Sequence, residues 1–354
     1  MSNAPARKVV PPALTVVPAS AAEGLELDSQ ERFQFHVRRH WTAPGDRNAH
    51  AREAEREVLA WFESLGCSAA ELRRAARCDV AGYIAMAFPL HGREEAIRVA
   101  KYICLWLLWD DVHVERLEHR WRLSAGDVLS GTRPPGMTRF DEGWWQLFGD
   151  LASRRSAGWL SELCDSMARW NDAAVEEAHW TERYQRTGVR PRFEEHLRMR
   201  IATIGMYPTL YLLEDAFGHE LPRGFHEHPT VRRLKLLANQ IVGLGNDILS
   251  FGKDLAEQQV NLVSTFMADH GVDAPEALSR LIGMHDASLE EFDQLAAAMP
   301  PVPEHCAPLL ARWLNAVRHA ALGFGLWEAQ APRYTEHQLV WNGKVIRPTF
   351  RFID

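Results

Sequence analysis

The sequence predicts an all-α protein whose helices form one large domain. Apolar residues recur at spacings of three and four along several long segments, and no comparable run alternates with period two. Gly and Pro fall between these segments, so short connections are expected. The helices are expected over His50–Leu65, Glu94–Leu117, Trp159–Glu177, Phe193–Phe217, Val231–Leu255, Leu289–Ala298 and Ala307–Trp327.

The two ends of the chain lie outside this helical pattern. Residues 1–28 are rich in Ala, Pro and Val and lack the basic region and continuous apolar core of a signal peptide, so we expect a flexible tail. Residues 29–354 then form the single domain. Within this domain, Val340–Asp354 is expected to be irregular or extended rather than helical.

Composition and charge argue against several classes of protein. With 354 residues, of which 46% are hydrophobic and 25% charged, the chain can bury a large core. A net charge of −7 without a Lys/Arg-rich face argues against a nucleic-acid partner, so a polyanionic substrate must be attracted by local charge or by metal. The apolar stretch Tyr102–Trp109 is far below the roughly 20 residues of a membrane-spanning helix. Five cysteines without close pairing or metal-type spacing predict a reducing, cytoplasmic environment.

A break is expected inside the helix predicted over Phe193–Phe217. Pro208 follows Gly205 closely, and an interior proline removes a backbone hydrogen bond and clashes with the preceding turn. We therefore expect a kink or break near Gly205–Pro208. Such a kink can also serve packing alone.

A first acidic cluster ends an apolar helix. Asp110, Asp111 and Glu115 follow Tyr102–Trp109, and Asp111 and Glu115 share a helical face because they stand four residues apart. Carboxylates this close repel one another unless a cation lies between them, so the cluster predicts a metal site. The alternative is a solvated helix end. His113 points off the face of the ligands and is expected to take no part.

A second, polar stripe lies in the helix predicted over Val231–Leu255. Asn246, Ser250 and Asp254 stand at i, i+4 and i+8, so their oxygens share one side of the helix. Asn and Ser are unfavourable in helix interiors, and their alignment therefore calls for a reason beyond helix stability. Lys253 lies beside the stripe and suits a phosphate oxygen. The stripe predicts a site for a hard cation such as Mg²⁺, and the alternative is an exposed polar face.

Together these motifs resemble those of the class I terpene synthases of the bacterial cyclase type. The family's D-D-x-x-x-E motif is matched by Asp110, Asp111 and Glu115. Its N-D-x-x-S-x-x-x-E motif is matched by Asn246, Asp247, Ser250 and, one methylene shorter than the usual Glu, Asp254. Glu257 is the alternative last ligand, and we favour Asp254.

Two further features resemble the same family. Arg200 stands shortly before the expected helix break, where the family has an arginine that senses the diphosphate. Arg333 and Tyr334 follow Trp327, as does the family's C-terminal Arg-Tyr pair. The matches occur in the family's order over about Phe88–Tyr334, which is most of the chain.

The resemblance implies a single helical bundle of the class I terpenoid synthase type with a central apolar cavity. It implies three Mg²⁺ ions that bridge the diphosphate of the substrate. The ligands of these ions are expected to be Asp110, Asp111, Glu115, Asn246, Ser250 and Asp254. The diphosphate is expected to be bound by Arg200, Lys253, Arg333 and Tyr334. The tail after about residue 335 would close over the site.

The same resemblance implies a carbocation that must be kept from water in an apolar, aromatic pocket. Trp106 and Trp327 are expected to stabilise it through their ring faces, each contributing about 0.5–2 kcal/mol. Phe88 or Tyr83 is a further candidate. Ordinary core packing is the alternative for each of these rings.

The expected helix break also gains a role from the resemblance. A backbone carbonyl near Ile204 would face the substrate, and Thr203 would couple this carbonyl to Arg200. Diphosphate binding and ionisation would thereby be linked.

The expected function is Mg²⁺-dependent ionisation and cyclisation of farnesyl diphosphate to a cyclic sesquiterpene, a hydrocarbon or an alcohol. The alternatives are a monoterpene or diterpene cyclase on the same fold and a helical diphosphate-binding protein that has lost catalysis. A chain-elongating prenyltransferase generally has two D-D-x-x-D motifs, and the Asn/Ser-based second motif disfavours it. A homodimer and a monomer are both compatible with the sequence.

Overall fold

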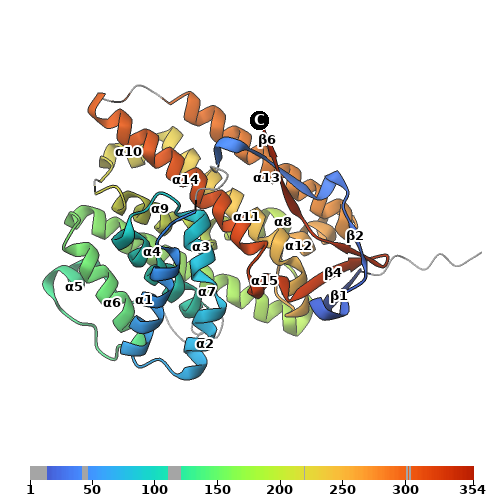
Figure 1. Cartoon of the computed structure of the whole chain (residues 1–354), viewed down its shortest axis with the longest axis horizontal. Coiled ribbons are helices and arrows are strands. Elements are labelled where there is room, and N and C mark those ends of the chain that lie inside the picture. Colours follow the sequence, from blue (N-terminus) through green and yellow to red (C-terminus); the bar gives the residue numbers. More distant parts are fainter. Residues whose placement is uncertain (1–13, 42–46, 111–120, 219, 300–301, 303) are drawn as a thin grey trace, which may run out of the picture.

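The computed structural model describes residues 14–41, 47–110, 121–218, 220–299, 302 and 304–354. Long helices form the body of the molecule, and short strands from both ends of the described chain gather at one side of it (Figure 1). The prediction of an all-α fold is confirmed, with two small sheets added to the helical body. None of the helices in the described part of the chain combines the length and the hydrophobicity that a membrane span requires.

Helix α11 (Pro229–Ala256) lies at the centre of the body. It packs against α8 (Phe193–Thr203), α13 (Ala274–Ala297) and α14 (Ala307–Glu328). Its start is fixed locally, because Pro229 occupies the first turn and the His228 side chain accepts a hydrogen bond from the Thr230 amide at 3.2 Å. The helices predicted from periodicity over Val231–Leu255 and Ala307–Trp327 correspond to α11 and α14.

Helix α4 (Arg93–Trp109) packs beside α1 (Ala51–Ser64), α3 (Val80–Ala87) and α6 (Arg139–Ala152). Nearly every side chain from Ala96 to Trp109 is buried, as expected for a helix that is apolar all round. Glu94 and Glu95 in its first turn favour the helix start through the helix dipole. Because α4 ends at Trp109, the described part of the chain brings Asp110 to its C-terminal end.

Helix α7 (Ala157–Thr187) lies against α8 and α9 (Met206–Asp215). Ser156 caps its start by accepting a hydrogen bond from the Trp159 amide at 3.2 Å, and Gly188 ends it in the left-handed conformation. The helix therefore extends beyond both ends of the predicted Trp159–Glu177.

The break predicted near Gly205–Pro208 is present between α8 and α9. Gly205 adopts a φ of +77°, which residues with a Cβ rarely adopt. A Cβ at this position would also lie 2.4 Å from the ring of Trp106. Pro208 sits within the first turn of α9, where its missing N–H costs no helical hydrogen bond, so Gly205 rather than Pro208 makes the break.

Several shorter helices were not predicted from periodicity. Capping boxes at Ser68, Ser124 and Thr138 start three of the unpredicted helices, and these local patterns could have revealed them. The remaining helices are α2 (Ala69–Arg77), α5 (Ala125–Ser130), α10 (Arg223–Glu227), α12 (Leu262–His270) and α15 (Pro332–Thr335).

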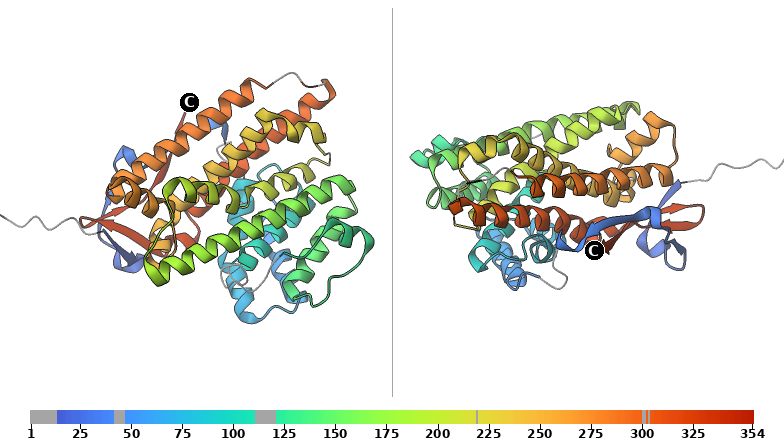
Figure 2. Two further views of the ribbon diagram at one scale, coloured as in Figure 1. Left: turned by 180° about the vertical axis from the view of Figure 1, so that it is seen from behind. Right: turned by 90° about the horizontal axis from the view of Figure 1, so that it is seen from above.

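The strands join the two ends of the described chain. One sheet has the order β1-β4-β5-β2, and β3 pairs with β6 in a second sheet. The bounds are β1 (Leu14–Pro18), β2 (Glu26–Asp28), β3 (Gln34–Arg38), β4 (His337–Trp341), β5 (Lys344–Ile346) and β6 (Thr349–Ile353). The pairs β1/β4 and β4/β5 are antiparallel, whereas β2/β5 and β3/β6 are parallel. Figure 2 shows from two further sides that these strands lie at one end of the helical body.

The sheets correct the prediction of a flexible tail over residues 1–28. Residues 14–18 and 26–28 are strands, because β4 and β5 supply partners for their backbone groups. The extended C-terminal segment is confirmed, and Asn342 and Gly343, with φ of 51° and 78°, make the tight turn between β4 and β5. β4 crosses α11 closely, since a Cβ at Gly252 would lie 3.1 Å from the His337 carbonyl oxygen.

Candidate active site

A cavity of about 460 Å³ is enclosed by side chains of α4, α7, α8, α11, α14 and α15. Most of the predicted site residues meet in its wall. They are Trp106, Asp110, Arg200, Asn246, Ser250, Lys253, Asp254, Arg333 and Tyr334. Asp111 and Glu115 lie outside the described residues, so their role as ligands stays a prediction.

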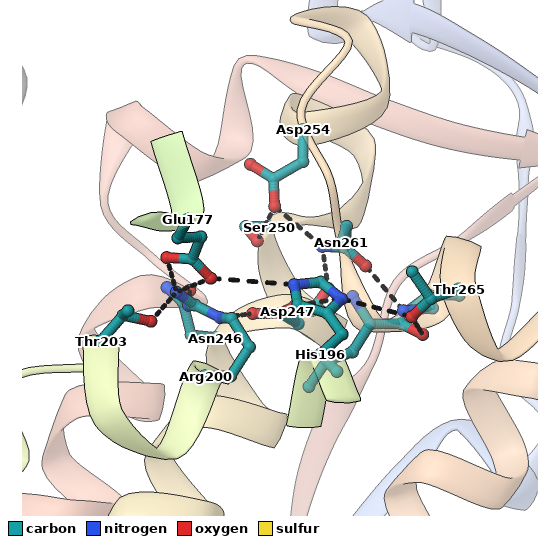
Figure 3. A network of polar contacts seen from close by, with 12 residues as sticks. Glu177, His196, Arg200, Thr203, Asn246, Asp247, Ser250, Asp254, Asn261 and Thr265 are labelled. Atoms are coloured by element: carbon teal, nitrogen blue, oxygen red, sulfur yellow. Dashed lines mark hydrogen bonds and ion pairs between the residues drawn. The ribbon is translucent and has the colours of Figure 1, made fainter. Parts of the chain in front are cut away.

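The polar stripe of α11 forms one wall of the cavity. Ser250 Oγ donates a hydrogen bond to Asp254 Oδ2 at 2.6 Å, and Asn261 Nδ2 donates to the same oxygen at 2.8 Å. Asn246 Oδ1 accepts from Arg200 Nη2 at 2.7 Å. The helical spacing thus brings the three predicted oxygen donors into one cavity, as Figure 3 shows for their side chains.

Arg200 is held by acceptors from three helices (Figure 3). Its Nε donates to Asp247 Oδ1 at 2.8 Å, and its Nη1 donates to Glu177 Oε2 and Thr203 Oγ1, each at 3.1 Å. Burial opposes the charge of Arg200, but Asp247 and Glu177 together raise its pKa above the ordinary value. Burial likewise opposes ionisation of Glu177, yet the charge of Arg200 and the nearby His196, whose Nε2 lies 3.7 Å from Glu177 Oε1, lower the pKa of Glu177 to about 2. The guanidinium is therefore charged and fixed in place.

Asp247 joins the helices around this arginine. Its Oδ2 accepts a hydrogen bond from the Leu262 amide at 2.7 Å, at the start of α12, while its Oδ1 accepts from Arg200. Asn261, the N-cap of α12, donates to the Asp247 carbonyl oxygen at 2.8 Å. Burial raises the pKa of Asp247, and the Arg200 charge opposes that shift. Asp247 therefore positions Arg200 rather than serving as a further oxygen of the stripe.

A buried carboxylate that the sequence analysis missed lies behind Asn246. Asn246 Nδ2 donates to Glu328 Oε1, and Glu328, on α14, is fully buried. Burial raises the pKa of Glu328 well above its ordinary value. With Arg200 on its oxygen and Glu328 on its nitrogen, the Asn246 amide has one fixed orientation.

Exposure distinguishes Asp254 from Glu257, the two candidates for the last ligand position beside Lys253. Lys253 Nζ lies 3.5 Å from Asp254 Oδ1 and 3.0 Å from Glu257 Oε2. The Asp254 side chain is 11% exposed and lines the cavity, whereas the Glu257 side chain is 43% exposed and is absent from the cavity lining. This geometry favours Asp254 over Glu257 as the ligand.

The aromatic wall differs from the prediction in one residue. Trp106 lines the cavity, one turn before Asp110, and packs edge-on against Trp170 at 5.6 Å between ring centres. Trp327 does not line the cavity, because it lies in the core, where its indole N–H donates to the Asp79 carbonyl oxygen at 3.1 Å. Phe324, one turn earlier on α14, lines the cavity instead.

The two further aromatic candidates also belong to the core. Tyr83 and Phe88 pack against each other at 5.7 Å between ring centres, and neither lines the cavity. Tyr83 further packs edge-on against Trp327 at 5.0 Å. These rings support the cavity wall from behind and do not face the space that a substrate would fill.

The oxygen donors of the stripe fit a hard divalent cation by their chemistry. An amide, a hydroxyl and a carboxylate oxygen lie on one helix, and Ser250 Oγ and Asp254 Oδ2 are close enough to reach a common ion. In the described residues no group of three or more His, Cys, Asp or Glu side chains is arranged to hold a metal ion. The stripe differs from such a group because it combines Asn and Ser oxygens with a single carboxylate.

Comparison with known proteins identifies the family to which this chain belongs. Residues 101–291, more than half of the 354 residues, match the family model described as terpene synthase family 2, C-terminal metal binding. The chain belongs to the class I terpene synthases. The resemblance noted in the sequence is thereby confirmed for the family, whose members are lyases.

Individual relatives are distant from this terpene synthase. An R-linalool synthase of Streptomyces clavuligerus is 26% identical over 216 residues, which span 60% of this chain and 63% of that protein. A 10-epi-cubebol synthase of Sorangium cellulosum is 30% identical over 215 residues, 59% of this chain and 67% of that protein. A pristinol synthase of Streptomyces pristinaespiralis is 24% identical over 316 residues, 83% of each chain.

The fold is shared with solved terpene synthases. The crystal structure of a linalool/nerolidol synthase from Streptomyces clavuligerus superposes with a TM-score of 0.68 at 20% identity. The superposition covers 81% of this chain and 98% of that one. The described residues therefore have the all-α class I terpene synthase fold.

Proposed function

We propose that this terpene synthase ionises and cyclises farnesyl diphosphate in a Mg²⁺-dependent reaction that yields a cyclic sesquiterpene and diphosphate. Family membership supports a prenyl diphosphate as the class of substrate. The observation that carries the proposal is a cavity, partly walled by aromatic side chains, in which an oxygen stripe meets several cations. These residues are Asn246, Ser250, Asp254, Arg200, Lys253 and Arg333.

The oxygen donors would hold Mg²⁺, which when bound supplies positive charge that neutralises the departing diphosphate. Asn246, Ser250 and Asp254 offer ligands from α11, and Asp110 offers a carboxylate from the end of α4. Glu328 and Arg200 hold the Asn246 amide in position before any ligand arrives. Such preorganisation lowers the free energy needed to assemble the site.

The cations would bind the diphosphate oxygens directly. A guanidinium such as Arg200 or Arg333 can donate two parallel hydrogen bonds, Lys253 adds a point charge, and the Tyr334 hydroxyl can donate one further hydrogen bond. As the allylic C–O bond breaks, negative charge gathers on the leaving oxygen. Donors already in place stabilise that charge without reorganising, which accelerates ionisation.

The remaining wall would protect and stabilise the carbocation. Trp106 and Phe324 present aromatic rings to the cavity, and Leu107, Ala174 and Val260 add apolar surface. A ring face within about 6 Å of a cation stabilises it by about 0.5–2 kcal/mol. Apolar surface also keeps water away from the cation until the rings of the product have closed.

The helix break would couple diphosphate binding to the cavity wall. Arg200 donates to Thr203 Oγ1, and the Thr203 carbonyl oxygen accepts from Trp170 Nε1 at 2.8 Å. Ile204, the next residue, lines the cavity. A diphosphate that draws the Arg200 side chain toward itself would therefore also shift the backbone beside the substrate.

The test is incubation of the purified protein with geranyl, farnesyl and geranylgeranyl diphosphate, with Mg²⁺ or with chelator, and gas chromatography with mass spectrometry of the extract. We expect a cyclic product from farnesyl diphosphate that disappears with the chelator. Turnover that survives the chelator would contradict the metal requirement. If none of the three is consumed, Asp254→Glu, which restores the usual family residue, separates a ligand that is too short from a fold that has lost catalysis.

A smaller substrate is the second candidate. The relative named R-linalool synthase aligns over 60% of this chain, and linalool has one isoprene unit fewer than a sesquiterpene. If geranyl diphosphate is the substrate, its kcat/KM in the same assay should exceed that of farnesyl diphosphate. The ratio of the two values therefore assigns the chain length.

A further inference from the structure

A basic groove of about 570 Å³ lies beside the cavity, along helix α2. We call it the α2 groove. Its cations are Arg73, Arg74 and Arg77 of α2, Lys253 of α11 and Arg333 of α15. Its carboxylates are Glu257 and Glu336. Five cations thus face two carboxylates in a chain whose net charge is −7.

This concentration of charge arises only in the folded chain. Arg73, Arg74 and Arg77 are close together in the sequence but far from Lys253 and Arg333, which join them only in the fold. A groove of about 570 Å³ can hold a small anion such as diphosphate. Its local field attracts anions despite the negative charge of the whole protein.

The arginines of the outer wall retain unused donors. Arg77 pairs with Glu336, and Lys253 pairs with Glu257 at 3.0 Å. Arg73 and Arg74 are exposed, and within the described residues neither forms an ion pair. Each guanidinium carries five N–H donors, so these two side chains can bind phosphate oxygens without first breaking an ion pair.

The α2 groove adjoins the cavity, because the two share wall residues. Lys253 and Arg333 line both spaces, so the cations of the groove lie beside those that would bind the diphosphate in the cavity. From these observations we propose that the α2 groove is an outer binding site for a diphosphate group, with Arg73 and Arg74 as its ligands. The inference rests on the proposed function, which makes a diphosphate both part of the substrate and a product.

The first experiment measures binding of inorganic diphosphate without turnover. Isothermal titration calorimetry of the whole protein is carried out in the presence of chelator, which removes Mg²⁺ from the cavity. The measured affinity then depends on the Lys and Arg side chains of the protein. We expect the double variant Arg73→Gln with Arg74→Gln to weaken the affinity about fivefold or more. The reason is that the exposed charge pairs of the two arginines with the bound diphosphate are lost. The charge reversal Arg73→Glu with Arg74→Glu should weaken it further. Added salt should reduce the wild-type affinity.

The matched control is Arg232→Gln with Arg233→Gln. This pair of adjacent arginines is also exposed on a helix, and it lies outside both the groove and the cavity. The control changes the net charge by the same amount and should leave the affinity at the wild-type value. Equal affinities for the wild type and the Arg73/Arg74 variants would overturn the inference.

Thermal unfolding distinguishes binding from a structural role. Arginines near the C-terminal end of a helix also stabilise it through the helix dipole. If the glutamine variant has a lower Tm and an unchanged affinity, the two arginines only stabilise α2, and the inference is wrong. A lower affinity at an unchanged Tm supports the binding site.

Steady-state kinetics assign the diphosphate to the entering substrate or to the leaving product. If the groove receives the substrate, the Arg73/Arg74 variant has a lower kcat/KM and an unchanged kcat. If it receives the product, the variant has a changed kcat and weaker inhibition by added diphosphate. Absence of any turnover in the wild type would contradict the proposed function, while the titration in chelator would still decide whether the groove binds diphosphate.

Discussion

The arginine–aspartate networks around Arg200 and Arg98 resemble each other, but only the first faces the cavity. Arg200 donates to Asp247 at 2.8 Å in the cavity wall, between α8 and α11. Arg98 donates to Asp215 at 2.6 Å between α4 and α9, and neither residue lines the cavity. The residue types and distances are alike. The networks differ in the balance of charge around each pair.

The network around Arg98 is balanced. Asp215 accepts from Arg98 and from Arg155 Nε at 2.7 Å, and Arg98 also donates to Asp150 at 2.8 Å. Each aspartate is therefore paired with two arginines, because Arg154 Nε also donates to Asp150 Oδ1 at 3.2 Å, and neither carboxylate lacks a counter-charge. A buried network of this kind holds helices together and has no remaining capacity for a ligand.

The network around Arg200 has an excess of carboxylates. Arg200 lies between Glu177 and Asp247, Lys253 lies 3.5 Å from Asp254, and the buried Glu328 lies nearby, so four carboxyl groups meet two cations. Burial raises the pKa of both Asp247 and Glu328, because removing a carboxylate from water disfavours its charged form. The comparison teaches that a binding site can hold more carboxyl groups than cations, so that a bound cation supplies the missing positive charge.

The largest effect is expected from breaking the balanced network. Asp215→Asn leaves Arg155 and part of Arg98 without a buried counter-charge, which should lower the free energy of unfolding by about 3–5 kcal/mol. Chemical denaturation measures this loss, with Asp165→Asn on the exposed face of α7 as control. Folded Asp215→Asn protein should keep the wild-type kcat. A lower kcat at unchanged stability would show that this network also serves the site.

Acid should act on the cavity network through Glu177. Its pKa of about 2 in the folded protein lies below its ordinary value of 4.5, so its contribution to stability is full above pH 4.5 and is lost as the pH falls toward 2. Over this range the wild type should lose up to about 3 kcal/mol more than Glu177→Gln does. Denaturation at several pH values measures the difference, with the exposed Glu182→Gln on α7 as control. Parallel curves for wild type and Glu177→Gln would refute the assignment.

Removing an oxygen from the stripe should affect turnover more than stability. Asn246→Ala deletes one oxygen that would bind the metal ion. We expect kcat/KM to fall at least about 100-fold, equivalent to about 2.7 kcal/mol. Asn239→Ala is the control, because this fully buried asparagine on α11, like the half-buried Asn246, makes two hydrogen bonds but lies outside the cavity lining. The control should lose stability and keep its turnover. Equal turnover in both variants would remove Asn246 from the metal site.

The smallest effect is expected at the helix break. Gly205→Ala would place a Cβ 2.4 Å from the Trp106 ring and strain the backbone, which should cost about 1–3 kcal/mol of stability. Gly131→Ala is the control, because Gly131 has a similar φ of +71° with no atom within 4 Å of the added Cβ. The difference between the two variants in denaturation isolates the clash. Equal losses would mean that Trp106 moves aside freely.

Local sequence patterns predicted the parts of the fold that depend on neighbours along the chain. The period of apolar residues located α11 and α14, and the pairing of Gly205 with Pro208 located the break. The strands were missed because β1 and β2 are short and depend on partners more than 300 residues away, such as Val340 and Val345. No local pattern records such a partner.

The candidate site divides in the same way. Asn246, Ser250 and Asp254 could be predicted because helical geometry fixes their common side once α11 is recognised. Glu177 and Glu328 were missed because they act through contacts with Arg200 and Asn246 on other helices. Each is one carboxylate among many in the sequence, and only its neighbours in space distinguish it.

The sequence by itself determined the helical class, the break at Gly205 and the side on which the α11 oxygens stand, because these follow from backbone geometry over a few turns. Only the tertiary structure decided that Phe324 rather than Trp327 faces the cavity, and that arginines of α2 meet Lys253 and Arg333 in one groove. The physical reason is that which face of a helix lines a cavity is set by the helices packed around it. Those contacts join residues that are distant in the chain.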